Sequence, residues 1–347
     1  MGRIPSYRSA HLMPYLEFFR GMGAPLESHL RTFHLPTMIT DGDDIYLPQI
    51  PTIAFLKKMA QSQGIDEMPL RALGSLHITD LSEHFVATAY QSPTLKMALD
   101  HFRKLAPLED PDVEFWMIPG EGTVRLCMTN HFPLDPQGLR FEDWGELLLL
   151  IAIVQGFAGT TWQPEEMAFR SDLPLSRYAS EEYPNTRFMI GQKAVWITVP
   201  LEVLSLPPLK RSEFTEAPLS SATEPRSNAI DGDELANSLR QVLPAYLADG
   251  YPLIQIAAQL AGISVRTLQR KLQDSSVSYS ELVQHARMDM ALKLLRTTDK
   301  KIIDIACQLG YEDPAHFTRS FVRQAGICPR EYRKQHLQRD HRASIYN

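Results

Sequence analysis

The chain has 347 residues, 44% of them hydrophobic, and a formal net charge of −6. A chain of this size and composition can bury a substantial core, which excludes a disordered protein and suggests two domains. The apolar run LLLLIAIV at residues 147–154 is too short for a bilayer, which needs about 20 apolar residues, so we expect a buried helix and no membrane contact. Three cysteines without a CxxC pair favour reduced thiols and a cytoplasmic location.

Charge is divided unevenly along the chain. Residues 233–347 contain 16 Lys and Arg against 12 Asp and Glu, a net of +4, whereas the preceding 232 residues contain 19 against 29, a net of −10. The basic part is the candidate for contacting a polyanion. Residues 211–232 are rich in Ser, Thr, Pro, Glu and Ala without apolar periodicity, which is typical of a linker. We therefore expect one domain over residues 1–210 and a second over residues 233–347.

The first domain is expected to combine helices with a sheet. Apolar residues at helical spacing predict helices over residues 50–64, 93–106 and 141–159. Alternating residues on both sides of a Pro-Gly-Glu-Gly turn predict a β-hairpin over residues 112–130, and residues 193–200 predict a further strand. This pattern indicates an α+β domain in which helices cover a sheet.

The second domain contains an internal repeat. IAAQLAGISVRTLQRKL at residues 256–272 is followed 49 positions later by IACQLGYEDPAHFTRSF at residues 305–321, so that Ala257 pairs with Ala306. Each copy has the pattern helix, short turn, helix, which is the helix-turn-helix arrangement whose second helix enters the major groove of DNA. We expect all-α motifs over about residues 253–273 and about residues 302–324.

The candidate DNA-reading residues follow from helix geometry. Leu268 and Leu272 of the first copy, and Phe317 and Phe321 of the second, are expected to face inward and so turn their neighbours outward. Arg can bind guanine and Gln can bind adenine through paired hydrogen bonds, each pair contributing roughly 1 to 3 kcal/mol of base discrimination. A solvated helix face is the alternative. The candidate DNA-binding residues are Arg266, Thr267, Gln269, Arg270, Ala315, His316, Thr318 and Arg319.

A helix is predicted between the two motifs, over residues 280–297, with one apolar stripe formed by Leu282, Ala286, Met290 and Leu294. Its length is roughly 27 Å at 1.5 Å per residue. Such a linker helix would hold two recognition helices near one turn of DNA apart, about 34 Å, so that they read successive major grooves.

Residues 233–334 resemble the DNA-binding domain of the AraC/XylS family of transcription regulators. The resemblance rests on RTLQRKL at residues 266–272, on the linker-helix residues Arg287, Ala291, Leu294 and Leu295, and on IACQLGYEDPAHFTRSFVRQAGICPREYR. Two positions depart from the family pattern. Ser276 stands where such domains often have glycine, which puts a left-handed helix cap in doubt, and Pro244 should end the preceding helix near Leu243.

Residues from about 20 to 210 resemble the arabinose-binding-type N-terminal domain of one branch of this family, most clearly in GTTWQPEEMAFRSDLP. The resemblance implies a regulator that binds double-stranded operator DNA, contacts RNA polymerase if it is an activator, and senses a small organic effector. We expect the N-terminal domain to form a homodimer, since operators read by two-motif monomers are usually paired. A domain that only dimerises or binds a protein partner is the alternative.

An enzymatic function is not expected. Some DNA-repair methyltransferases carry a similar module, but they also use a four-cysteine zinc site, and this chain has three cysteines. The sequence lacks GxSxG, P-loop, GxGxxG and HExxH motifs, so we predict no catalytic residue, metal ligand or cofactor. A partner-binding adaptor that has lost DNA binding is disfavoured by Arg270 and Arg319.

Overall fold

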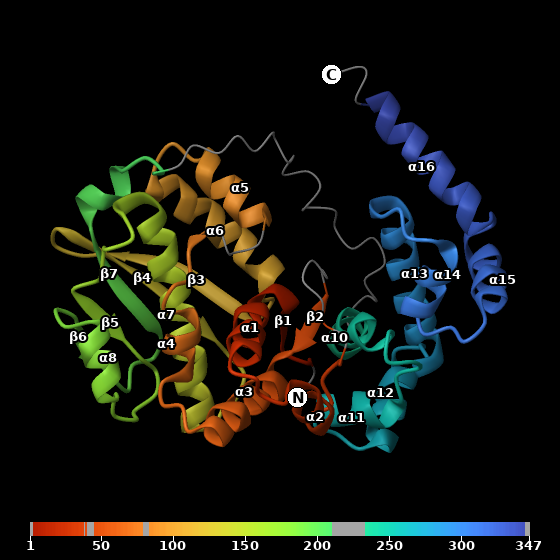
Figure 1. Ribbon diagram of the computed structural model, residues 1–347, viewed down its shortest axis with the longest axis horizontal. Coiled ribbons are helices and arrows are strands. Elements are labelled where there is room, and N and C mark those ends of the chain that lie inside the picture. Colours follow the sequence, from red (N-terminus) through yellow and green to blue (C-terminus); the bar gives the residue numbers. More distant parts are fainter. Residues whose placement is uncertain (1–2, 38, 40–44, 79–82, 210–232, 344–347) are drawn as a thin grey trace.

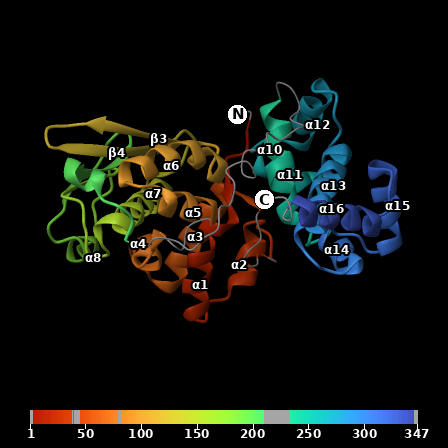
Figure 2. The ribbon, with the colours of Figure 1, turned by 90° about the horizontal axis from the view of Figure 1, so that it is seen from above.

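The structure is a computed structural model, and it describes residues 3–37, 39, 45–78, 83–209 and 233–343. An α+β part and an all-helical part lie side by side, which confirms the predicted fold class (Figure 1). Seen from above, helix α10 (Glu234–Val242) and the N-terminal end of the chain lie at the junction of the two parts (Figure 2). The predicted linker, residues 211–232, falls outside the described residues.

A five-stranded sheet forms the centre of the α+β part, in the order β3-β4-β7-β5-β6. Neighbouring strands are antiparallel, except that β5 and β6 are parallel. The predicted hairpin is confirmed as β3 and β4, and the strand predicted over residues 193–200 is β7. The bounds are β3 Val113–Pro119, β4 Thr123–Asn130, β5 Glu166–Ala168, β6 Arg187–Met189 and β7 Val195–Pro200.

The long helix α7 (Pro136–Ala158) packs against this sheet through its apolar run. Leu147, Leu150, Ile153 and Val154 are fully buried, so residues of the run belong to the core, as predicted. Burying each such side chain contributes about 1.5–3 kcal/mol, which makes α7 a main source of stability for this part. Among the described residues, no helix is long and apolar enough to cross a bilayer.

The remaining helices of the α+β part surround α7 and the sheet. The helices predicted over residues 50–64 and 93–106 are confirmed as α3 and α6. A second, small antiparallel sheet pairs β1 (Ser6–Arg8) with β2 (Tyr46–Pro48) beside the helical part. The other elements are η1 Ser9–His11, α1 Met13–Gly21, α2 Leu26–Thr32, α3 Gln49–Gln63, α4 Met68–Leu73, α5 Glu83–Gln91, α6 Leu95–Glu109, α8 Arg177–Glu182 and η3 Leu201–Ser205.

The helical part begins with α10, which ends at Val242 as Pro244 predicts, because proline cannot donate the hydrogen bond that would continue the helix. The linker helix is confirmed as α13, and it starts at a capping box formed by Ser278 and Glu281. The elements after α10 are η4 Leu243–Tyr246, α11 Ile254–Leu260, α12 Val265–Asp274, α13 Tyr279–Thr297, α14 Ile302–Gln308, α15 Pro314–Ala325 and α16 Pro329–Ala343.

The two helix-turn-helix copies differ in the length of their turns. The second helices, α12 and α15, are 49 positions apart, but the first helices, α11 and α14, are 48 apart. The matching buried pairs are Ala257 with Ile305, Ala258 with Ala306, Leu268 with Phe317 and Leu272 with Phe321. The pairing of Ala257 with Ala306 was therefore wrong by one residue, because the turn of the second motif is one residue longer.

A left-handed glycine follows the first helix of each motif, Gly262 with φ 64° and Gly310 with φ 70°. The Gly310 N–H donates to the Cys307 carbonyl at 2.9 Å and the Tyr311 N–H to the Ala306 carbonyl at 3.0 Å, which is the Schellman pattern. A side chain at Gly310 would overlap the carbonyl oxygen of Leu247. The turn of the second motif is thus pressed against the loop after η4, where only glycine fits.

Ser276 does adopt the left-handed conformation, with φ 56°, after the end of α12. Its N–H donates to Gln273 at 2.9 Å, and the Val277 N–H donates to Leu272 at 3.0 Å, so the cap is again a Schellman motif. The doubt raised by a serine at this position was misplaced, because these hydrogen bonds satisfy the last carbonyls of the helix.

The two parts share a buried junction. Ile4 is 1% exposed and packs in the core of the helical part, where its N–H donates to the Ser238 hydroxyl of α10 at 3.0 Å. In the opposite direction, Tyr246 of η4 packs in the core of the α+β part. At the edge of the junction, Thr37 donates to Asp249 through both its N–H and its hydroxyl, at 3.0 and 2.6 Å. Each part therefore completes the core of the other.

We predict that Gly310→Ala destabilises the chain more than Gly326→Ala. Both glycines have positive φ, but a methyl group at Gly326 meets no atom within 4 Å. Gly326→Ala should cost about 1 kcal/mol of backbone strain, and Gly310→Ala about 2 kcal/mol more from the overlap with Leu247. Urea unfolding measures both free energies. Equal losses in the two variants would contradict the packing described for the second turn.

Candidate functional site

The second helix of each motif begins at a side-chain cap. The Ser264 hydroxyl accepts from the Thr267 N–H at 3.2 Å at the start of α12. The Asp313 carboxylate accepts from the Ala315 N–H at 2.8 Å at the start of α15, where Pro314 takes the first helical position. These caps fix the starts of the two helices that carry the candidate DNA-reading residues.

The candidate residues form two separate groups, one on α12 and one on α15. In the first group Arg266, Gln269 and Arg270 are exposed, and in the second Ala315, His316 and Arg319 are exposed. The two threonines differ from this pattern, because Thr267 and Thr318 are half-buried. The Thr318 hydroxyl donates to the Pro314 carbonyl at 3.0 Å, and the Thr267 hydroxyl lies 2.9 Å from that of Ser264. Both threonine hydroxyls therefore engage their own helix.

Arg319 also has a partner within its helix. Its guanidinium lies 3.8 Å from the Asp313 carboxylate, and both side chains are largely exposed. Surface ion pairs of this kind contribute little, about 0 to 1 kcal/mol, so Arg319 can exchange this partner for a phosphate or a base edge at small cost.

Arg287 of α13 holds the second motif on the linker helix. It is buried, its Nε donates to the Leu309 carbonyl at 2.9 Å, and a terminal nitrogen donates to the Gly310 carbonyl at 2.8 Å. Its guanidinium lies 4.4 Å from the centre of the Tyr311 ring. From the sequence, Arg287 supported only the family resemblance. Its spacing of four residues from buried Ala291 was the signal that it faces inward.

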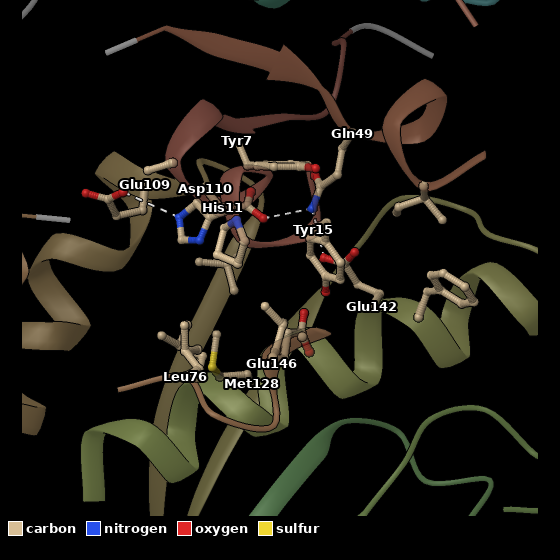
Figure 3. Close-up of a pocket in the computed structure, with 18 of the residues that line it drawn as sticks. Tyr7, His11, Tyr15, Gln49, Leu76, Glu109, Asp110, Met128, Glu142 and Glu146 are labelled. Carbon is tan, nitrogen blue, oxygen red and sulfur yellow. Dashed lines mark hydrogen bonds and ion pairs between the residues drawn. The ribbon is translucent and has the colours of Figure 1, made fainter. Parts of the chain in front are cut away.

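A second candidate site is a cavity of about 140 Å³ inside the α+β part. Its walls come from β1, η1, α1, α3, α4, α6, β3, β4 and α7, with Leu76 after α4 closing one side (Figure 3). No DNA-reading candidate lies in it. The polar groups in its lining are Tyr7, His11, Tyr15, Gln49, Glu109, Asp110, Glu142 and Glu146.

Amide groups hold the carboxylates of this cavity in place. Gln49 Nε2 donates to Asp110 at 3.0 Å and to Glu142 at 2.9 Å. Asn130 Nδ2 donates to Glu142 at 3.3 Å and to Glu146 at 3.1 Å. The Gln49 amide thus bridges Asp110 and Glu142, which lie on neighbouring walls. The Asn130 amide bridges Glu142 and Glu146, which both belong to α7.

Arg170 neutralises only part of this charge. It lies in the segment that resembles the family's N-terminal domain, and it pairs with Asp143 at 2.7 Å and with Glu146 at 3.1 Å. His11 faces Glu109 at 3.4 Å. Among the described residues, neither Asp110 nor Glu142 has a Lys, Arg or His within ion-pair distance.

Burial and neighbouring charges shift the pKa values of the titratable side chains that line the cavity. Burial raises the pKa of Asp110 to about 6 and that of Glu142 to about 7, and the charge of Asp110 adds to the shift of Glu142. Burial lowers the pKa of His11, but the hydrogen bond and charge of Glu109 outweigh it, so the pKa of His11 is raised. The cavity therefore gains negative charge as the pH rises through neutrality.

No residue of this cavity was predicted from the sequence. Its polar groups come from segments as far apart as Tyr7 and Glu146, so no local motif marks it. One signal was present, since Glu142 and Glu146 are four residues apart on a helix predicted to be mostly buried. Buried carboxylates on one helix face are costly and commonly have a function.

Residues 257–335 match a family model described as "Helix-turn-helix domain". The chain is 24% identical over 250 residues to the ornithine utilization regulator of Pseudomonas aeruginosa, covering 72% of each protein. It is 32% identical over 217 residues to the HTH-type transcriptional activator RhaS of Enterobacter sp. (strain 638), covering 62% of this chain and 71% of that protein.

Among solved structures, the transcriptional regulator CdpR from Pseudomonas aeruginosa aligns over 89% of this chain and 96% of its own. The sequence identity is 19% and the TM-score is 0.37.

We predict that the folded chain loses stability as the pH rises from about 5 to about 8. Folded Asp110 and Glu142 keep protons that the unfolded chain releases, because their ordinary pKa values are 3.8 and 4.5. This contribution is complete below the unfolded pKa values and is lost as the pH passes 6 and then 7. Glu142→Gln should reduce the loss by about 1 kcal/mol or more, the equivalent of one pKa unit.

Thermal unfolding at both pH values measures this effect. Glu114→Gln, which removes an exposed carboxylate from β3, serves as the matched control and should unfold like the unaltered chain at each pH. The assignment fails if Glu142→Gln follows the pH dependence of this control.

Proposed function

The chain belongs to the AraC/XylS family of DNA-binding transcription regulators, and we propose that it reads an operator with α12 and α15 under the control of an effector held in the cavity. DNA binding and transcription regulation follow from the family. The base-reading residues, the effector and the oligomeric state are the proposal. Exposed arginines on both recognition helices carry the DNA-reading part of it.

The proposed readers are Arg266, Gln269 and Arg270 in the first motif, and His316 and Arg319 in the second, because these long side chains are exposed on the helices that enter the groove. Ala315 is also exposed and is small enough for contact with a thymine methyl group. Thr267 and Thr318 are better suited to a backbone contact, since their hydroxyls engage their own helices. The linker helix α13, roughly 28 Å long, would place the two groups in successive major grooves.

Arg270→Ala is expected to weaken specific DNA binding by roughly 1 to 3 kcal/mol, because a base-edge contact is lost while the buried face of α12 is untouched. Operator fragments recovered by chromatin immunoprecipitation supply the target, and fluorescence anisotropy measures the affinity. Arg177→Ala in α8 is the control, since Arg177 is 92% exposed and lies in the α+β part. Unchanged affinity in a folded Arg270→Ala variant would show that Arg270 is merely solvated.

The effector part rests on the position of the cavity relative to the junction. Tyr7 and His11 line the cavity, and Ile4, three residues before Tyr7, is buried against α10. Gln49 is tied to the same segment, because its N–H donates to the Pro5 carbonyl at 2.9 Å. A ligand that changes the position of this segment therefore acts directly on the first helix of the DNA-binding part. Bound and free states would differ in how α10 is held.

An effector is expected to raise the unfolding temperature of the full chain and to change its affinity for DNA. A ligand at about 100 times its dissociation constant stabilises the folded state by roughly 2.7 kcal/mol. A metabolite screen by thermal shift, followed by DNA titration with each hit, tests both effects. If no metabolite shifts the unfolding temperature, the N-terminal domain only dimerises or binds a protein partner.

We further propose a homodimer formed through the α+β part and, by similarity to the activator RhaS, contact with RNA polymerase at the promoter. Because its target is DNA, the protein would act in the compartment that holds the chromosome, which we expect to be the cytoplasm. The relatives named above are transcription regulators, and an enzymatic activity is not proposed.

A further inference from the structure

We propose that the effector taken up by the cavity is an organic cation, a small ammonium compound with an apolar body. This inference rests on the proposed function, in which the cavity is an effector site, and it adds the chemical class of the ligand. It is carried by the charge of the walls, an unused hydrogen-bond acceptor and the apolar remainder of the lining.

The charge of the walls is strongly one-sided. The lining contains four carboxylates and neither Lys nor Arg. Glu109 faces His11 and Glu146 faces Arg170, which leaves Asp110 and Glu142 held only by N–H donors of amides. Two neighbouring buried carboxylates without a cation are costly, and an ammonium group would remove that cost. An anionic ligand would add to it.

Gln49 indicates where the ammonium group would be received. Its nitrogen faces Asp110 and Glu142 and donates to both carboxylates. Its Oε1 is then buried without a hydrogen-bond partner, in a side chain that is 1% exposed. A buried acceptor of this kind needs a donor, and an ammonium group has up to three. The same group could therefore reach Gln49 and both carboxylates.

The rest of the lining suits an apolar body. Aliphatic side chains cover much of the wall, and Phe102 and Phe141 add aromatic surface that favours a nearby cation. A cavity of about 150 Å³ in another protein holds a benzene molecule, so the 140 Å³ here matches a ligand of similar size. The aliphatic lining residues are Ile53, Leu56, Leu73, Leu76, Val113, Met128 and Leu149.

A metal ion is a poorer match than an organic cation. The described residues contain no group of three or more His, Cys, Asp or Glu arranged to hold a metal. Metal ions also need several ligands converging on one point, whereas an ammonium group can use two carboxylates and one amide oxygen.

The test uses the full-length chain and three probes with the same six-carbon body, namely hexylamine, hexan-1-ol and hexanoate. Thermal shift and isothermal titration calorimetry near neutral pH measure their binding. Hexylamine is expected to raise the unfolding temperature and to bind at least about tenfold more tightly than hexan-1-ol, a difference of 1.4 kcal/mol, while hexanoate should give no shift. Asp110→Asn combined with Glu142→Gln should remove this preference for the amine.

Glu114→Gln, which removes an exposed charge from the same part of the chain, should leave hexylamine binding unchanged. Failure of the doubly altered chain to fold would not decide the question, so Glu142→Gln alone, expected to weaken hexylamine about tenfold, provides the same comparison. Equal binding of hexan-1-ol and hexylamine, or amine binding that survives loss of both carboxylates, overturns the cation assignment and leaves an effector cavity standing. No shift with any probe overturns it as well, and no shift across the metabolite screen removes the effector proposal itself.

Discussion

One segment, Ile4 to His11, belongs to both parts of the molecule at once. Its first residue is buried among the helices of the DNA-binding part and bonds to Ser238, while Tyr7 and His11 form a wall of the cavity. Closely packed interiors deform little, so a segment fixed at both ends transmits a displacement from one end to the other. Tyr246 adds a contact in the reverse direction, from η4 into the core of the α+β part. The two parts are therefore joined by packing, and under the proposed function an effector in the cavity would act on the DNA-binding part through this contact.

The cavity shows how a fold accommodates charge that it cannot neutralise. Among the described residues, Arg170 is the one arginine that forms ion pairs with carboxylates of α7, and its partners are Asp143 and Glu146. Glu142 and Asp110 accept hydrogen bonds from amide groups, and burial raises the pKa values of both carboxyl groups toward 7. Such an arrangement is less stable than an apolar core would be, and groups with strongly shifted pKa values in a cavity mark it as a candidate functional site.

In the helical part, backbone contacts set the position of the second motif. Gly310 lies against the Leu247 carbonyl with no room for a side chain, and Arg287 donates to the carbonyls of Leu309 and Gly310. The turn is thus held between the loop after η4 and the linker helix. The turn of the first motif is one residue shorter.

The sequence by itself determined the elements and the outward residues of the helical part. Helical periodicity, the caps at Ser264 and Asp313, and the proline at position 244 all act within a few residues, so they can be read locally. It also predicted the hairpin and the burial of residues 147–154. It did not determine the one-residue offset between the motifs, the left-handed Ser276, the shared junction at Ile4 or the acidic cavity. The junction and the cavity depend on contacts between residues distant in the chain, and only the tertiary structure decides which distant groups meet and which buried charges remain without a partner.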